Sequence, residues 1–192
     1  MKNLFIFLVF IPFFSVAQDL PIVDDKIVYE KIIDAPGMSK SELYAASKRF
    51  VANAVRSAKS VIQTEDEGTG LIICKGNVTL QHARSRMALI VPGRPVGGTK
   101  YFTMQFESKE GRCRVRIYDI FEDNTFQPYD RNYSLEEIFF DLASRTNSSK
   151  GKTQEKRKTL FNESVTIVNN AFFGLIHDFE RSINNYKNND DW

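Results

Sequence analysis

The side chains of this sequence best suited to bind a ligand are three arginines at alternate positions, Arg112, Arg114 and Arg116. In a β-strand, residues two apart point to the same face, so the three guanidinium groups are expected to form one basic stripe. Tyr118 continues the alternation, and Lys75 of a neighbouring strand is expected close by. Guanidinium groups bind carboxylates and phosphates, and tyrosine beside arginine is favoured at protein interfaces. The stripe is therefore a candidate site for an anionic ligand or an acidic partner.

A solvated sheet face is the simpler explanation of the same stripe. Glu107 is expected to face Arg114 on the adjacent strand and to neutralise part of its charge. Surface charges of this kind commonly do no more than keep a sheet hydrated. Both explanations predict that the arginines point away from the core.

Catalytic chemistry has little support in the sequence. His82 and His177 are the only histidines, and neither belongs to a recognisable catalytic or metal-binding motif. The sequence has no zinc-protease HExxH, no GxSxG and no phosphate-binding loop. We therefore predict no catalytic residue, no metal and no cofactor, with an unrecognised hydrolase as the least favoured alternative.

The two cysteines, Cys74 and Cys113, are predicted to be buried free thiols. Both fall on inward-facing strand positions, because the residues around them alternate between apolar and polar. If one strand separates them, their Cα atoms lie about 9 to 10 Å apart, beyond the roughly 7 Å limit for a disulfide. A disulfide is the alternative in an oxidising compartment.

The element that must position the arginine stripe is a β-hairpin over residues 101–120. With Glu110-Gly111 at the centre of the turn, apolar residues face apolar residues and polar residues face polar ones across the two arms. A register shifted by one would move one arm's apolar set to the wrong face. The predicted pairs are Met104 with Ile117, Phe106 with Val115, Glu107 with Arg114, Gln105 with Arg116, and Thr103 with Tyr118.

The elements around this hairpin alternate between strand and helix patterns. A strand over 26–35 is followed by a capping box at Ser39-Glu42 and a helix to about Val61. A polar turn over 63–69 leads to a strand over 71–80, a possible short strand over 87–91 and a flexible connection over 92–98. After the hairpin come a second capping box at Ser134-Glu137, a short helix, a basic linker over 144–158, and a long helix over 161–186 in which Gly174 is expected to allow a close contact.

This order predicts an α+β fold, with a single antiparallel sheet of four to five strands and helices packed on one face. Many of the phenylalanines fall on the inward stripes, and they could either fill a core or line a pocket for a small apolar ligand between the sheet and the C-terminal helix. Core packing is the simpler explanation, so a ligand carrier is kept as the alternative function. The residues concerned are Phe102, Phe106, Phe139, Phe161, Phe172 and Phe179.

The N-terminus predicts export. Residues 1–17 combine a lysine, an apolar run too short to span a bilayer, and the small-x-small sequence Ser15-Val16-Ala17, which is typical of a cleaved signal peptide. We expect a flexible lead-in over 18–25, a single domain over 26–186 and a disordered tail over 187–192, in the periplasm or outside the cell. Without Lys2 the chain has 25 basic and 24 acidic residues, so its net charge does not predict nucleic-acid or anionic-membrane binding.

Three stretches of the chain carry a family resemblance: YEKIIDAPGMSKSELYAASKRFVANAV, GLIICKGNVTL and YFTMQFESKEGRCRVRIYDI. Over about Asp25 to Phe121 the sequence resembles the domain of unknown function with a TATA-binding-protein-like fold that is found in exported proteins of Gram-negative bacteria. The resemblance implies helices packed on a sheet and an exported location. It carries no activity and no catalytic residues, and it is no reason to expect DNA binding, because fold does not imply function.

Taken together, these observations predict an exported, non-catalytic domain. We expect it to bind another component of the cell envelope, either a protein or an anionic molecule, through Arg112, Arg114, Arg116, Tyr118 and Lys75 on the outward sheet face. No nucleic-acid partner and no transmembrane segment are expected.

Overall fold

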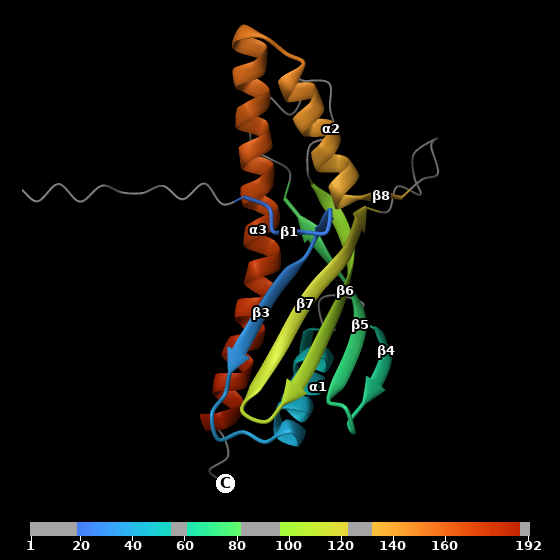
Figure 1. Cartoon of the computed structure of the whole chain (residues 1–192), viewed down its shortest axis with the longest axis vertical. Helices are drawn as coiled ribbons and strands as arrows, with labels where there is room; N and C mark the ends of the chain where they lie inside the picture. Colours follow the sequence, from blue (N-terminus) through green and yellow to red (C-terminus); the bar gives the residue numbers. More distant parts are fainter. Residues whose placement is uncertain (1–18, 55–60, 82–96, 123–131, 189–192) are drawn as a thin grey trace, which may run out of the picture.

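The computed structural model describes residues 19–54, 61–81, 97–122 and 132–188 (Figure 1). The expected signal peptide, the possible strand over 87–91, most of the connection over 92–98 and His82 lie outside the described residues. Among the described helices, none is both long and apolar enough to cross a membrane.

One antiparallel sheet of six strands organises the described part of the chain. The strand order is β3-β7-β6-β5-β4, and β8 pairs with the end of β7. The α+β class is confirmed, although the sheet is larger than the four to five strands predicted, because an edge strand and the two-residue β8 join it. The strands are β3 (Tyr29–Asp34), β4 (Val61–Asp66), β5 (Leu71–Leu80), β6 (Gly98–Lys109), β7 (Arg112–Glu122) and β8 (Tyr133–Ser134).

Two helices, α1 (Lys40–Ala54) and α3 (Gly151–Asn188), cover one face of this sheet, and α2 (Leu135–Asn147) packs against α3. Both predicted capping boxes are present. At α2, Glu137 N donates to Ser134 Oγ at 3.2 Å and Ser134 N donates to Glu137 Oε2 at 3.0 Å. The corresponding pair at α1 is Ser39 and Glu42. These reciprocal bonds satisfy the free N–H groups that begin each helix.

The central hairpin has the predicted register. Met104 faces Ile117, Phe106 faces Val115 and Glu107 faces Arg114, as the matching apolar and polar faces of the two arms require. Gly111 adopts a φ of 70° in the turn, where a residue with a Cβ atom would be strained. Beyond Tyr118 the register shifts at Asp119, which has a φ of 50° and forms a bulge opposite Phe102.

The segment after α1 differs from the prediction. The sequence predicts that the helix continues to Val61 and that a polar turn occupies 63–69, whereas the chain forms the edge strand β4 over Val61–Asp66. Its pairing with β5 shifts at Gln63. An edge strand with exposed side chains and a shifted register does not show the strict alternation by which strands are predicted from sequence.

The N-terminal lead-in, predicted to be flexible, contains a small hairpin. Strands β1 (Ile22–Val23) and β2 (Lys26–Ile27) pair through a turn in which Asp24 and Asp25 both have positive φ. Ile27 N also donates to Glu136 Oε1 of α2 at 2.8 Å. Backbone pairing of this kind leaves no hydrophobic pattern in two-residue strands, so the sequence could not predict it.

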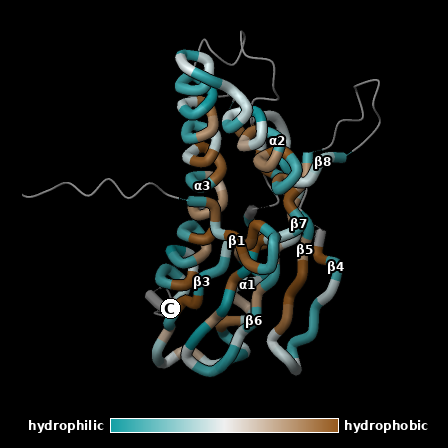
Figure 2. Tube along the Cα trace, turned by 45° about the horizontal axis from the view of Figure 1, so that its top comes forward, coloured by the Kyte–Doolittle hydropathy of each residue, from teal (hydrophilic) through white to brown (hydrophobic). Residues whose placement is uncertain are grey.

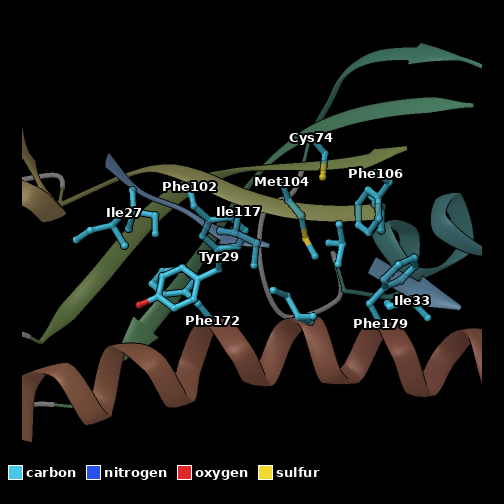
Figure 3. Close-up of a cluster of buried hydrophobic side chains, with 14 of the residues drawn as sticks. Ile27, Tyr29, Ile33, Cys74, Phe102, Met104, Phe106, Ile117, Phe172 and Phe179 are labelled. Atoms are coloured by element: carbon cyan, nitrogen blue, oxygen red, sulfur yellow. The ribbon is translucent and has the colours of Figure 1, made fainter. Parts of the chain in front are cut away.

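The core lies between the sheet and the two helices that cover it (Figure 3). The ring of Phe106 in β6 lies 4.7 Å from that of Phe179 in α3, and the rings of Phe102 and Phe172 are 5.6 Å apart. These edge-on contacts are typical of a filled aromatic core. The expected close contact at Gly174 is wrong, since a Cβ atom at this position would meet nothing within 4 Å.

Helix α3 extends beyond the sheet. It has 38 residues, or about 57 Å at the rise of an α-helix. Its first part pairs with α2, with Phe139 packed edge-on against Phe161 at 5.7 Å. The predicted linker over 144–158 is therefore mostly helical: α2 continues to Asn147 and α3 begins at Gly151. Figure 2 shows hydrophilic residues prevailing around the turn that joins α2 to α3.

Candidate functional site

The arginine stripe lies on the sheet face opposite the helices, as predicted. Its members Arg112, Arg114 and Arg116 alternate along β7 with buried Cys113 and Val115. Buried residues point to the helices, so the intervening guanidinium groups point to solvent. The stripe is thus an outward surface of the sheet, and its chemistry depends on what neutralises each cation.

Two of the arginines are neutralised within the protein. Arg114 Nη2 donates to Glu107 Oε2 on β6, and Arg116 Nε lies 2.9 Å from Glu30 Oε2 on β3, an ion-pair distance without hydrogen-bond geometry. Partial burial of Glu107 opposes ionisation, but hydrogen bonds from Arg114 and Gln105 outweigh it and lower the pKa of this carboxyl. The simpler explanation, a solvated sheet face whose charges are neutralised by neighbouring carboxylates, therefore fits Arg114 and Arg116.

Tyr118 belongs to the same network. The guanidinium carbon of Arg116 lies 5.8 Å from the centre of the Tyr118 ring, a cation–π contact. The Tyr118 hydroxyl donates to Gln105 Oε1 at 3.1 Å, and Gln105 Nε2 donates to Glu107 Oε1 at 2.6 Å. The chain of contacts from Glu30 to Arg114 across three strands fixes these side chains in place before any partner arrives.

The two cations at the turn of the hairpin, Lys109 and Arg112, differ from Arg114 and Arg116 in their ion pairing. Within the described part of the chain, neither Lys109 nor Arg112 lies within ion-pair distance of a carboxylate, although Asp34 faces Arg112 on β3. Both side chains line a shallow depression of about 180 Å³ together with Glu107, Arg114 and Ile32, whose surface is 55% exposed. The depression therefore combines two cations that have no carboxylate partner among the described residues with one exposed apolar side chain, Ile32.

Lys75 does not reach this depression. It lies on β5 and faces Thr103 of β6, so β6 separates it from the arginines of β7. Lys75 is exposed and also has no carboxylate partner among the described residues. The structure thus brings Arg112 and Arg114 together at the depression and leaves Arg116, Tyr118 and Lys75 outside it.

Sequence reasoning missed two residues of the depression, Lys109 and Ile32. Lys109 could have been found by continuing the hairpin register, because it faces Arg112 in the pair next to the turn. Ile32 could not, because its position depends on β3 lying beside β7, a long-range pairing that no local pattern specifies.

The interior of the protein and the histidines are weaker candidates for a functional site. The aromatic side chains proposed as pocket walls pack against one another, with Phe50 also edge-on to Phe179 at 5.2 Å, so a carrier function is not favoured. His177 is exposed on α3. In the described segments, no three acidic, histidine or cysteine side chains cluster as a metal site would require. Both cysteines are buried free thiols, on β5 and β7 with β6 between them.

A second hollow lies between α2 and α3, outside the sheet. Its volume is about 550 Å³, and its floor includes Phe161, with Thr146, Gln154, Glu155 and Lys158 on its walls. The mixture of neutral and oppositely charged walls does not select a particular ligand chemistry, so the depression at the hairpin turn is the better candidate site.

Comparison with known proteins places this geometry in a family. Residues 29–122 match the family model described as a domain of unknown function (DUF4468) with TBP-like fold. No curated protein matches the chain.

Two solved structures share the fold. A DUF4468 family protein from Bacteroides ovatus aligns over 86% of this chain and 91% of its own, with a TM-score of 0.57 and 20% sequence identity. A TBP-like protein from Parabacteroides distasonis aligns over 84% of this chain and 97% of its own, with a TM-score of 0.50 and 18% identity. Residues 29–122, which contain α1 and strands β3 to β7, therefore belong to the DUF4468 family with TBP-like fold.

Proposed function

We propose that this protein is an exported, non-catalytic binding domain that associates with an acidic protein, or another anionic component of the cell envelope, through its outward sheet face. The contact centres on the depression at the hairpin turn. Export is supported by the signal-peptide pattern of residues 1–17.

The observation that supports this proposal is the contrast between paired and unpaired cations on one face. Glu107 and Glu30 already bind Arg114 and Arg116. A partner carboxylate would have to compete with these internal pairs, and the exchange would gain little. Lys109 and Arg112 have no such competitor in the described structure, so an anionic group placed over them forms new ion pairs without breaking old ones.

The exposed Ile32 complements this charge. A partner that covers the depression buries an apolar side chain as well as neutralising two cations. Burial beside the ion pairs excludes water and strengthens them. The expected partner is therefore an acidic surface that also carries an apolar group.

The test is capture of partners from an envelope extract by the immobilised protein, comparing wild type with the double variant Lys109→Gln/Arg112→Gln. The variant should lose the captured components, and acidic proteins should be the ones lost. The matched control is Lys26→Gln/Arg181→Gln, which removes two positive charges elsewhere on the surface and should capture as the wild type does. Equal capture by the first variant, or equal loss by the control, would contradict the proposal.

A further inference from the structure

Residues 144–158 carry a local excess of positive charge. The whole chain has a formal net charge of +2, yet residues 144–158 alone contain six basic residues and one acidic residue, Glu155. Net charge hides this segregation because acidic residues elsewhere balance it. The basic segment is Arg145, Lys150, Lys152, Lys156, Arg157 and Lys158.

This basic segment forms the turn between α2 and α3, which projects at one end of the long axis of the molecule (Figure 1). The hairpin turn at Glu110-Gly111 lies at the opposite end. The segment is therefore separate from the depression on the sheet.

Most of the charge at this turn is not neutralised. Arg145 forms an ion pair with Asp141, and Arg157 Nη1 donates to Arg145 O at 2.7 Å and to Ser149 Oγ at 2.6 Å, which holds the turn together without a counter-charge. The four lysines have no carboxylate within ion-pair distance in the described segments, and all four are exposed. Lys152 and Lys156 are four residues apart on one helix, a like-charge spacing that costs stability.

The shape of the turn decides what it can contact. Lys152 and Lys156 lie on one side of α3, whereas Lys158 lies on another, where it lines the hollow between the helices. Residues 151 to 158 span about 10 Å along the helix, close to the Debye length of about 8 to 10 Å at physiological salt. A flat charged surface approached end-on would therefore attract all four lysines together.

The same residues disfavour two other classes of partner, single-stranded nucleic acid and an apolar protein surface. Residues 144–158 contain no aromatic side chain on which the bases of a single strand could stack, and no apolar side chain that could anchor a protein interface. Adsorption to anionic lipid headgroups needs neither, because each lysine near the surface contributes separately. We propose that the α2–α3 turn binds the anionic surface of a lipid bilayer.

The test is sedimentation of the chain from Gln18 onward, which contains every described residue, with phosphatidylcholine vesicles that contain about one third phosphatidylglycerol. Wild type should bind these vesicles more tightly than vesicles of phosphatidylcholine alone, and binding should weaken as salt rises. The variant Lys150→Gln/Lys152→Gln/Lys156→Gln/Lys158→Gln should bind at least about tenfold more weakly. Glutamine has about the same helix propensity as lysine, so the variant should fold as the wild type does. An unchanged thermal unfolding curve would verify this.

The matched control removes four positive charges elsewhere, by Lys26→Gln/Lys48→Gln/Lys75→Gln/Arg181→Gln, all on exposed side chains outside both the turn and the depression, and should retain at least most of the wild-type binding. An equal loss in both variants would assign the effect to net charge and overturn the proposal. The proposal would also be overturned if the wild type bound anionic vesicles no more tightly than vesicles of phosphatidylcholine alone. Tighter binding of duplex DNA than of vesicles, lost on mutation of the same four lysines, would assign the turn to nucleic acid instead.

Discussion

Tyr29 at the start of β3 and Asn169 in the middle of α3 are joined by a hydrogen bond of 2.8 Å, with the tyrosine hydroxyl donating to Asn169 Oδ1. Both residues are fully buried, and burial raises the pKa of Tyr29 well above its usual range. Asn169 Nδ2 donates in turn to Asp19 O at 3.3 Å. The pair therefore ties the N-terminal segment, the sheet and the long helix together.

Replacing Tyr29 with phenylalanine should lower the free energy of unfolding by about 1 to 3 kcal/mol, because Asn169 Oδ1 loses a buried donor. Urea unfolding followed by circular dichroism measures the change. Tyr118→Phe is the control, since its hydroxyl bonds to Gln105 on the half-exposed sheet face and its loss should cost less than about 0.5 kcal/mol. Equal effects of the two variants would contradict a structural role for the Tyr29 bond.

Gly70→Ala should destabilise the protein more than Gly111→Ala. Both glycines have positive φ, about 1 to 2 kcal/mol unfavourable for alanine. At Gly70 the added Cβ atom would also lie 2.4 Å from the carbonyl oxygen of Ser108, whereas at Gly111 it would meet nothing within 4 Å. Thermal unfolding should thus show a clearly larger fall in Tm for Gly70→Ala, and a larger fall for Gly111→Ala would show that the close approach to Ser108 is wrong.

Alkaline pH should destabilise the fold through Cys74. Burial raises the pKa of this thiol from 9.0 to about 11. The folded state therefore holds the proton more tightly than the unfolded state, so the stabilisation is complete below about pH 9 and is lost as pH rises toward 11. The free energy of unfolding, measured by urea titration between pH 8 and about 11, should fall in the wild type and fall less steeply in Cys74→Ala. The same slope in both proteins would exclude Cys74 as its source.

The capping box of α2 should contribute about 1 kcal/mol to stability. Ser134→Ala removes the acceptor for Glu137 N and leaves the first turn of the helix with an unpaired N–H group. Ser41→Ala is a suitable control, because Ser41 is exposed in the first turn of α1. A chemical denaturation midpoint that shifts for Ser134→Ala alone would support the cap, and equal shifts would not.

Local patterns predicted the parts of this fold that local interactions determine. The register of the central hairpin follows from two arms whose apolar faces match, as in Phe106 opposite Val115. The capping boxes at Ser39 and Ser134 follow from side chains that satisfy backbone groups three residues away. In each case the residues that decide the structure are neighbours in sequence.

Long-range pairing accounts for most of what sequence alone did not predict. Strand β4 is held by β5 with a shifted register, and β3 is placed beside β7 across the sheet. This placement puts Glu30 next to Arg116 and Ile32 next to Arg114. Which cations of the stripe are neutralised is therefore a property of the assembled sheet, and the composition of β7 could not reveal it.

If both proposed contacts form, helix α3 also acts as a spacer between them. It runs without interruption from the α2–α3 turn to the end of the sheet, about 57 Å at the α-helical rise. A bilayer at one end and an acidic partner at the other would be held at a fixed stand-off distance on the order of 50 Å. Because α2 and the first part of α3 carry the turn together, removing one turn from each helix should bring the two ligands closer together. The reach of the protein is then set by the length of this helical pair.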